Sequence, residues 1–225
     1  MNARRDSDLD PQPSRFTPNT RRTPRSIIVA LERRLARRLR GVAPPSDQWI
    51  RQTMHESVDE YVRALRPDDH DAVEISGHFY GDYPWRSYEH WDYPSFDLCN
   101  PGPMQRSFDV VICDQVLEHV TDPITAVHTL FDLCRPGGNV VVGVPFLVRI
   151  HRAPGDYWRF TPDGLRILLE HPGFDVLRVE GWGNRRCVKA NFLVWARTPK
   201  WSSNVNEPDF PVNVWAFARK PLELS

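Results

Sequence analysis

Two histidines stand among acidic and aromatic residues in patterns that can carry out proton transfer. His119 directly follows Glu118, and His151 begins the segment HRAPGDYWRFT (residues 151–161), which also holds an acid, arginine and three aromatic residues. Since the ordinary pKa of histidine is about 6.5, a neutral imidazole can take a proton from a substrate near neutral pH. His119 and His151 are therefore candidate catalytic bases, although either could instead bind a neighbouring loop and serve only the fold.

The elements around these residues predict that they meet at one edge of a parallel sheet. Residues 110–112 form a short apolar run that is typical of a buried strand, and the Asp-Pro pair at 122–123 is typical of a helix start. The sequence PGG at 136–138 ends that helix before a second buried strand at 140–144. Ligands of open α/β sheets bind beyond the carboxyl ends of the strands, where the polar residues that follow 110–112 fall.

The whole segment 108–146, FDVVICDQVLEHVTDPITAVHTLFDLCRPGGNVVVGVPF, resembles the central part of a class I S-adenosylmethionine-dependent methyltransferase of the type 11 kind. The family pattern contains FD-[VL]-V, a polar turn, V-L-E-H-V, L-[KR]-P-G-G and a second strand, in this order. The resemblance implies an α/β fold with a Rossmann-like sheet, mostly parallel with an antiparallel last strand, and helices on both faces. It also implies S-adenosyl-L-methionine as the cofactor and an S-adenosylmethionine-dependent O-methyltransferase as the enzyme.

The resemblance assigns residues to each part of the cofactor. In the family, an acid and a glycine-rich loop follow the first strand, where missing Cβ atoms let the backbone approach the ligand; here serine replaces the first glycine. Other acids bind the ribose hydroxyls and meet the adenine amine, and residues after 110–112 contact the methionine end. The corresponding residues are Glu74, Ser76, Gly77, Asp92, Asp97, Asp114 and Gln115. The alternatives are an ordinary strand-to-turn junction at 74–77 and turn residues around Pro94.

Residues 151–161 are similar to the family's loop over the acceptor pocket, H-x-x-P-x-D-[YFW]-[YW]-R-[FY]-[ST]. This similarity assigns Asp156, Tyr157, Trp158 and Arg159 to substrate binding. Because aromatic faces stack on the C–H surfaces of sugars, we expect O-methylation of a hydroxyl on a saccharide or another small polar acceptor. The resemblance extends loosely to bacterial sugar O-methyltransferases, including those that cap methylmannose polysaccharides. Alternatively, Asp156 and Arg159 pair within a packed lid, and the aromatic residues only fill space.

A divalent metal ion such as Mg²⁺ is a further candidate cofactor. Ubiquinone-type O-methyltransferases resemble the chain at E-x-x-E-H, where two carboxylates and a histidine can hold such an ion. Here Gln115 occupies the first carboxylate position, and Asp114 lies one residue away. Glu118 and His119, with a partner such as His151, could still form a metal site.

The chain divides into three predicted regions. Residues 1–24 contain four prolines and few large apolar residues, which is typical of a disordered tail. Residues 25–66 form an N-terminal helical extension, with a basic amphipathic helix at 25–40 and a second helix that begins near Ser46. Residues 67–225 form the methyltransferase domain, with strands at 72–75, 88–91, 174–179 and 212–218, a helix at 162–170 and a long insertion at 183–210.

The 225 residues carry no formal net charge, but charge is distributed unevenly along the chain. Residues 1–41 hold eleven arginines and four acidic residues, a net charge of +7, which leaves −7 for the rest. We expect the basic helix 25–40 to pack on the body or on a second subunit, as in a homodimer; weak contact with an anionic membrane is the alternative. No RNA-binding motif accompanies this helix, so no nucleic-acid partner is expected.

Four cysteines without CxxC spacing, and no apolar run of about 20 residues, predict a cytoplasmic protein with reduced thiols and no transmembrane segment. The degraded loop at 74–77 leaves a second function open. In that interpretation the chain is a non-catalytic binding or scaffold protein on a decayed methyltransferase fold, which docks through helix 25–40.

Overall fold

The computed structural model describes residues 49–104, 106–152, 154–193 and 205–222. The predicted tail 1–24, the predicted basic helix 25–40 and the predicted helix start at Ser46 lie outside the described residues.

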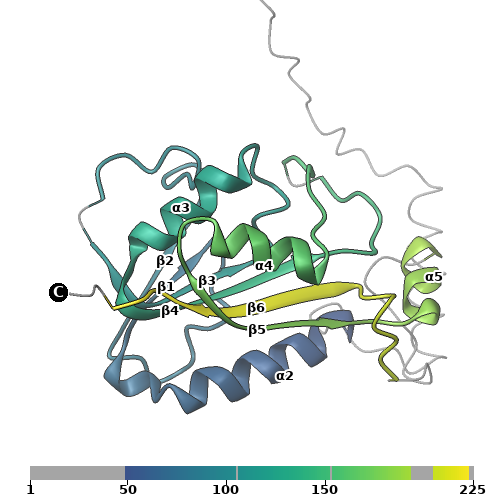
Figure 1. Cartoon of the computed structure of the whole chain (residues 1–225), viewed down its shortest axis with the longest axis horizontal. Coiled ribbons are helices and arrows are strands. Elements are labelled where there is room, and N and C mark those ends of the chain that lie inside the picture. Colours follow the sequence, from purple (N-terminus) through teal and green to yellow (C-terminus); the bar gives the residue numbers. More distant parts are fainter. Residues whose placement is uncertain (1–48, 105, 153, 194–204, 223–225) are drawn as a thin grey trace, which may run out of the picture. The chain divides into compact units, whose positions relative to one another are not determined.

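Six strands form one sheet at the centre of the described chain. They are β1 (Asp71–Ile75), β2 (Ser87–Trp91), β3 (Phe108–Asp114), β4 (Cys134–Pro145), β5 (Asp175–Trp182) and β6 (Asn213–Arg219). Their order across the sheet is β2-β1-β3-β4-β6-β5 (Figure 1). The first four strands in this order are parallel, whereas β6 runs antiparallel to both β4 and β5. The predicted sheet, mostly parallel with an antiparallel last strand, is therefore confirmed.

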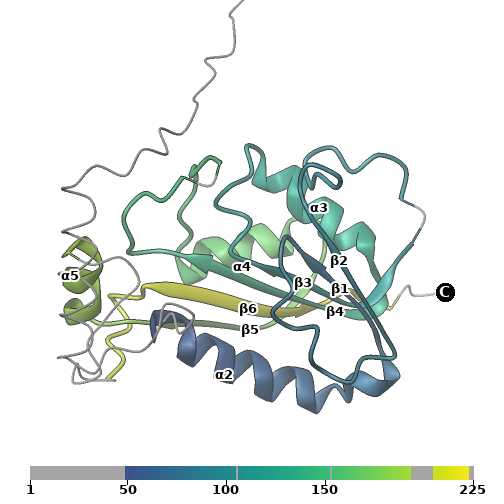
Figure 2. The ribbon, with the colours of Figure 1, turned by 180° about the vertical axis from the view of Figure 1, so that it is seen from behind.

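Helices cover both faces of this sheet. α2 (Trp49–Ala64) lies on one face, and α3 (Pro123–Leu133) and α4 (Pro162–Glu170) lie on the other, as Figures 1 and 2 show from opposite sides. A 3-10 turn at Pro67–Asp69 leads from α2 into β1. Among the described residues, no helix is long and apolar enough to cross a membrane.

Side-chain caps start α3 and α4 at the predicted residues. The Asp122 carboxylate accepts hydrogen bonds from the backbone N–H groups of Ile124 and Thr125, each at 3.1 Å. Thr161 Oγ1 accepts a hydrogen bond from the N–H of Gly164 at 3.0 Å. Because the first N–H groups of a helix have no partner within the helix, these caps fix where each helix begins.

The alternation of side chains along β3 divides the apolar core between the two faces. Val111 and Cys113 belong to the cluster on the side of α3 and α4, whereas Val110 and Ile112 belong to the cluster on the side of α2. Buried leucines of α3 and α4 complete the first cluster, and three apolar residues of α2 contribute to the second: Met54, Val58 and Val62. The same alternation places Asp114, the last residue of β3, on the side of α2.

The insertion at 183–210 contains a helix that the sequence did not predict, α5 (Arg185–Leu193). At its start, the Asn184 side chain accepts a hydrogen bond from the Cys187 N–H at 2.9 Å. The segment RRCVKANFL is short, and its apolar residues form no regular helical stripe, so its sequence pattern did not indicate a helix.

Candidate active site

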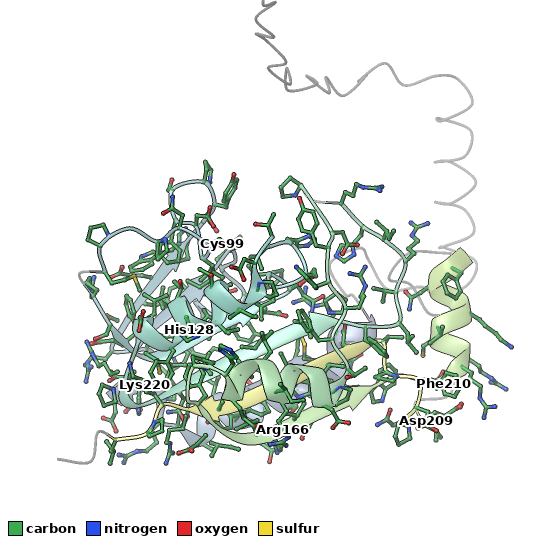
Figure 3. The ribbon with its side chains drawn as sticks, turned by 45° about the horizontal axis from the view of Figure 1, so that its top comes forward. Cys99, His128, Arg166, Asp209, Phe210 and Lys220 are labelled. Carbon is green, nitrogen blue, oxygen red and sulfur yellow. The ribbon has the colours of Figure 1, made fainter. Side chains whose placement is uncertain are left out.

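A cavity of about 410 Å³ lies at the carboxyl ends of the parallel strands β1, β2 and β3. Residues that follow each of these strands line it, together with part of the segment that follows β4. The lining includes five of the predicted site residues, namely Ser76, Asp97, Gln115, His119 and Tyr157. Cys99, another lining residue, lies well apart from Phe210 of the insertion in Figure 3.

Glu74 shapes the loop after β1 from inside the protein. Its carboxylate is buried and accepts hydrogen bonds from the N–H groups of Phe79 and Tyr80, each at 3.0 Å, and from the Tyr88 hydroxyl at 2.6 Å. Burial and the hydrogen bond to Glu74 raise the pKa of Tyr88, so this phenol keeps its proton. The Glu74 carboxylate is thus bound to the protein itself and holds the loop beside the cavity.

The loop after β1 keeps the backbone geometry of a glycine loop although one glycine is replaced. Ser76 has a φ of 55°, in the left-handed region that glycine adopts most easily. A Cβ atom on Gly77 would collide with Oε1 of Glu74. A side chain at position 77 would therefore displace the Glu74 carboxylate, which holds the loop.

Asp114 and Gln115, neighbours at the end of β3, face different surroundings. Gln115 lines the cavity, and its buried side-chain nitrogen Nε2 has no hydrogen-bond partner among the described residues. Asp114 lies beneath α2 instead, where its carboxylate pairs with Arg51 and lies 3.9 Å from Nε2 of His55. Of the two residues predicted to bind the methionine end of the cofactor, only Gln115 is among the cavity residues.

Asp97 and Asp92, the two predicted cofactor-binding acids after β2, line two neighbouring cavities. Asp97 lines the first cavity, and its Oδ1 accepts a hydrogen bond from the Cys99 N–H at 2.8 Å. Asp92 is largely exposed and lines a second cavity of about 560 Å³, which shares Phe96 with the first. Between β2 and β3 the described residues form turns and no strand, so Asp97 stands in a turn.

Glu118, His119 and His151 converge beside the first cavity. Glu118 is fully buried, and neither of its carboxylate oxygens has a hydrogen-bond partner within the described chain. Its Oε1 lies 3.6 Å from Nε2 of His119 and 3.7 Å from Nε2 of His151. The two imidazole rings are nearly perpendicular, with centroids 5.1 Å apart. The structure thus brings both predicted bases and the candidate metal ligand Glu118 into one cluster.

The segment 151–161 orients both histidines. The ring nitrogen Nδ1 of His119 contacts the carbonyl oxygen of Gly155, and because a carbonyl only accepts, Nδ1 carries the proton. Nδ1 of His151 lies 3.4 Å from a carboxylate oxygen of Asp156, which also accepts a hydrogen bond from the His151 N–H at 2.7 Å. Arg159 pairs with Asp156 through both carboxylate oxygens. Asp156 and Arg159 therefore bind each other, as in the packed-lid alternative.

Two exposed aromatic side chains complete this segment. Tyr157 is 57% exposed and lines the first cavity, and its N–H donates to the Glu118 carbonyl oxygen at 2.7 Å. Trp158 is 39% exposed, and its indole N–H donates to the Val120 carbonyl oxygen at 2.9 Å. These bonds tie the segment after β4 to the residues after β3, while the aromatic faces stay accessible.

The ion pair of Asp156 leads to a prediction about acid. Burial raises the pKa of this carboxyl, but the hydrogen bonds from Arg159 and from the His151 N–H outweigh burial and hold the pKa at about 2. The unfolded value is about 3.9, so the anion stabilises the fold above that pH, and this contribution is lost as the pH falls towards 2. We expect the wild type to be more stable than Asp156→Asn at pH 6.

Urea unfolding of both proteins between pH 6 and pH 2.5 measures this difference. The advantage of the wild type should shrink steadily below about pH 4. A difference that stays constant over this range would show that the Asp156 charge does not contribute to the free energy of unfolding.

Sequence reasoning missed residues on both sides of β3. Tyr93, Phe96 and Leu98 line the first cavity; they lie around the two predicted acids after β2, and their apolar character was the only available signal. Arg51 and His55, which meet Asp114, stand four residues apart on α2. Polar residues at this spacing beside the apolar stripe of a helix can indicate a buried polar contact.

Comparison with known proteins assigns the chain to a family. A family model described as a methyltransferase domain matches residues 52–179, more than half of the chain. The chain belongs to this methyltransferase family. S-adenosylmethionine is the cofactor of such domains, so the family and the cofactor predicted from the sequence are confirmed.

Curated relatives of this methyltransferase domain include two ubiquinone biosynthesis O-methyltransferases. The protein from Cupriavidus pinatubonensis is 33% identical over 92 residues, which cover 33% of this chain and 37% of that protein. The protein from Xylella fastidiosa (strain M23) is 31% identical over 121 residues, which cover 42% of this chain and 49% of that protein. The matched region thus spans less than half the length of either relative.

Solved structures of similar shape are more distant in sequence. An S-adenosylmethionine-dependent methyltransferase from Mesorhizobium loti is 15% identical, with a TM-score of 0.46, over 71% of this chain and 96% of that one. The N-methyltransferase NodS from Bradyrhizobium japonicum WM9, in complex with S-adenosyl-l-homocysteine, is 12% identical, with a TM-score of 0.45, over 72% and 86%. At these values the likeness says nothing about the acceptor.

The residues of the methyltransferase domain fit its cofactor at the first cavity. The cavity lies at the carboxyl edge of the parallel strands, and its volume of about 410 Å³ is within the range of small-molecule sites. The unpartnered amide nitrogen of Gln115 offers a hydrogen-bond donor there. The left-handed Ser76 and the tight approach of Gly77 to Glu74 keep the adjoining backbone in the form that a glycine loop provides.

Proposed function

We propose that the protein transfers the methyl group of S-adenosylmethionine to a hydroxyl of a saccharide or another small polar acceptor. The observation that carries this proposal is the cluster of Glu118, His119 and His151 beside the cavity at the carboxyl edge of the sheet. The O-methyltransferase relatives support the choice of oxygen as the acceptor atom.

Cofactor binding is assigned to the residues around the first cavity. Ser76, Asp97 and Gln115 would contact the cofactor, whereas Glu74 and Gly77 would hold the loop in place. Asp92, in the adjoining cavity, is the proposed partner of the ribose hydroxyls. S-adenosylmethionine supplies a sulfonium methyl group, which an acceptor oxygen takes as the C–S bond breaks and its electron pair stays on sulfur.

The histidine cluster is assigned to activation of the acceptor. An alcohol is a poor nucleophile until it loses its proton, so the hydroxyl must be bound where a group can take that proton. His119 carries its ring proton on Nδ1, which leaves a lone pair on Nε2 towards the cluster. His151 presents Nε2 to the same Glu118 oxygen. We assign deprotonation of the hydroxyl to this cluster.

The accessible aromatic faces support a saccharide as the acceptor. Tyr157 lines the cavity directly, and Trp158 is held close by through its bond to Val120. Their exposed rings can stack on the C–H surface of a sugar, whose hydroxyl would then reach the histidines.

Calorimetry and radiolabelled methyl transfer test the proposal with the full chain. We expect micromolar binding of S-adenosylhomocysteine and transfer of labelled methyl groups to at least one member of a panel of saccharides, phenols and small alcohols. Absence of binding would favour a non-catalytic scaffold on a methyltransferase fold. Binding with transfer only to amines would overturn the choice of oxygen.

The variant Gly77→Ala tests the cofactor loop. We expect it to weaken S-adenosylhomocysteine binding by roughly tenfold or more, about 1.4 kcal/mol, because the added Cβ displaces Glu74 and the loop it holds. The matched control is Gly164→Ala in the first turn of α4, which should leave the calorimetric affinity unchanged. Equal affinities of Gly77→Ala and the wild type would place the cofactor elsewhere.

A further inference from the structure

We infer that Glu118, His119 and His151 bind a divalent first-row transition-metal ion, such as Zn²⁺. One ligand atom from each residue lies within 4.8 Å of the other two. The distances from the Glu118 oxygen to the two imidazole nitrogens, 3.6 and 3.7 Å, are too long for direct hydrogen bonds. Two ligands bound at about 2.0–2.1 Å to a tetrahedral Zn²⁺ lie about 3.4 Å apart. The observed separations are therefore close to those of atoms that share one ion.

The buried carboxylate of Glu118 requires a positive partner. The residue is fully buried, and both of its oxygens lack hydrogen-bond partners among the described residues. An isolated carboxylate in such surroundings has a large desolvation cost, so buried carboxylates are paired or coordinate metals. Arg159 of the segment 151–161 is already engaged by Asp156. The described side chains give Glu118 no hydrogen bond, and a cation held jointly with the two imidazoles would supply the missing positive charge.

The surroundings of the two histidines are those of metal ligands. A metal-bound histidine usually donates its other ring N–H to a carbonyl or carboxylate, which fixes the orientation of the ring. Nδ1 of His119 meets the Gly155 carbonyl oxygen, and Nδ1 of His151 lies beside the Asp156 carboxylate. Both Nε2 atoms therefore point at the same Glu118 oxygen.

The donor set selects the kind of ion. Mg²⁺ prefers oxygen ligands in octahedral geometry, whereas imidazole suits zinc, iron, cobalt and nickel. A Mg²⁺ site was expected from two carboxylates and a histidine, but Gln115 replaces one carboxylate and faces the cavity. His151, from the segment after β4, takes that place, and two histidines with one carboxylate favour a transition metal over Mg²⁺.

The ion would also have open coordination positions. Three protein ligands leave room for a hydroxyl oxygen, whose pKa a divalent ion lowers. This role in acceptor activation rests on the proposed function, whereas metal binding itself does not.

Metal analysis of the full chain tests the inference. After removal of bound metal by a chelator, we expect the wild type to take up about one equivalent of Zn²⁺ and, with Co²⁺, to develop visible absorption bands. Glu118→Gln and His151→Ala should each lower Zn²⁺ affinity by roughly 100-fold or more, since loss of even an outer partner costs about 10–100-fold. Circular dichroism and S-adenosylhomocysteine calorimetry check that both variants are folded.

A matched control is His128→Ala. His128, labelled in Figure 3, lies exposed on α3 and pairs with His171. It should bind Zn²⁺ as the wild type does. No uptake by the wild type, or equal uptake by Glu118→Gln and His151→Ala, would overturn the inference, and preferential binding of Mg²⁺ would overturn the choice of ion.

Failure of the inference and failure of the proposed function are distinguishable. Methyl transfer at the full rate by metal-free protein would exclude a role of the ion in acceptor activation and would leave the proposed methyl transfer standing. If the wild type takes up Zn²⁺ and Glu118→Gln does not, but the wild type transfers no methyl group to any acceptor, the metal site is supported and the proposed reaction is wrong.

Discussion

His151→Ala is expected to lower the kcat of methyl transfer by about 10²–10⁴-fold while the affinity for S-adenosylhomocysteine stays unchanged. The imidazole contributes Nε2 to the cluster with Glu118 and His119 and does not line the cofactor cavity. Its loss therefore removes activation of the acceptor without touching the proposed cofactor site. Steady-state kinetics with the acceptor found in the radiolabel assay, and calorimetry with S-adenosylhomocysteine, measure the two effects separately.

The control and the positioning variant sharpen this expectation. His128→Ala should keep full activity, because His128 contacts only the distant His171 in the described hydrogen bonds. Asp156→Asn should lower kcat less than His151→Ala does, because it weakens the contact that orients His151 but keeps the imidazole itself. An unchanged kcat in His151→Ala would exclude this residue from catalysis. A parallel loss of cofactor affinity would instead indicate a structural role for the segment 151–161.

The fold could be predicted where local rules and the overall pattern agree. The helix at 162–170 was predicted with its observed limits because Thr161 and the following proline define its start. β4 begins at Cys134, before the predicted strand at 140–144, because Cys134 pairs with Phe108 across an irregular register. Such pairing depends on a neighbouring strand and leaves no trace in the local sequence.

The sequence indicates at which edge of the sheet the candidate site lies, but not which side chains contact one another there. β3 and β4 are adjacent and parallel, so the residues after them meet, and the convergence of His119 with His151 follows from topology. Alternation along β3 places Asp114 on the side of α2, whereas Gln115 follows the strand in a left-handed conformation, φ 59°, that the alternation does not predict. Arg51 reaches Asp114 from 63 residues earlier in the sequence, a contact that no spacing rule supplies.

The second large effect is expected beneath α2, where Asp114→Ala should lower the free energy of unfolding by about 3–5 kcal/mol. The side chains of Asp114 and Arg51 are only 5% and 10% exposed, so removal of the carboxylate leaves a buried arginine without its partner. His55 does not replace the lost charge interaction, because burial and the nearby Arg51 lower the pKa of His55 and keep it neutral. Urea unfolding measures the loss.

Matched variants decide between a structural and a cofactor role for Asp114. The double variant Arg51→Met/Asp114→Val should recover most of the lost stability, because it leaves no buried charge unpaired. Glu56→Ala, which breaks only an exposed hydrogen bond with Gln52 on the same helix, should unfold almost as the wild type does. If Asp114→Ala keeps its stability but no longer binds S-adenosylhomocysteine, the carboxylate acts on the cofactor, as the resemblance to the family implies. If stability falls and the double variant restores both stability and binding, Asp114 serves to fasten α2 to the sheet.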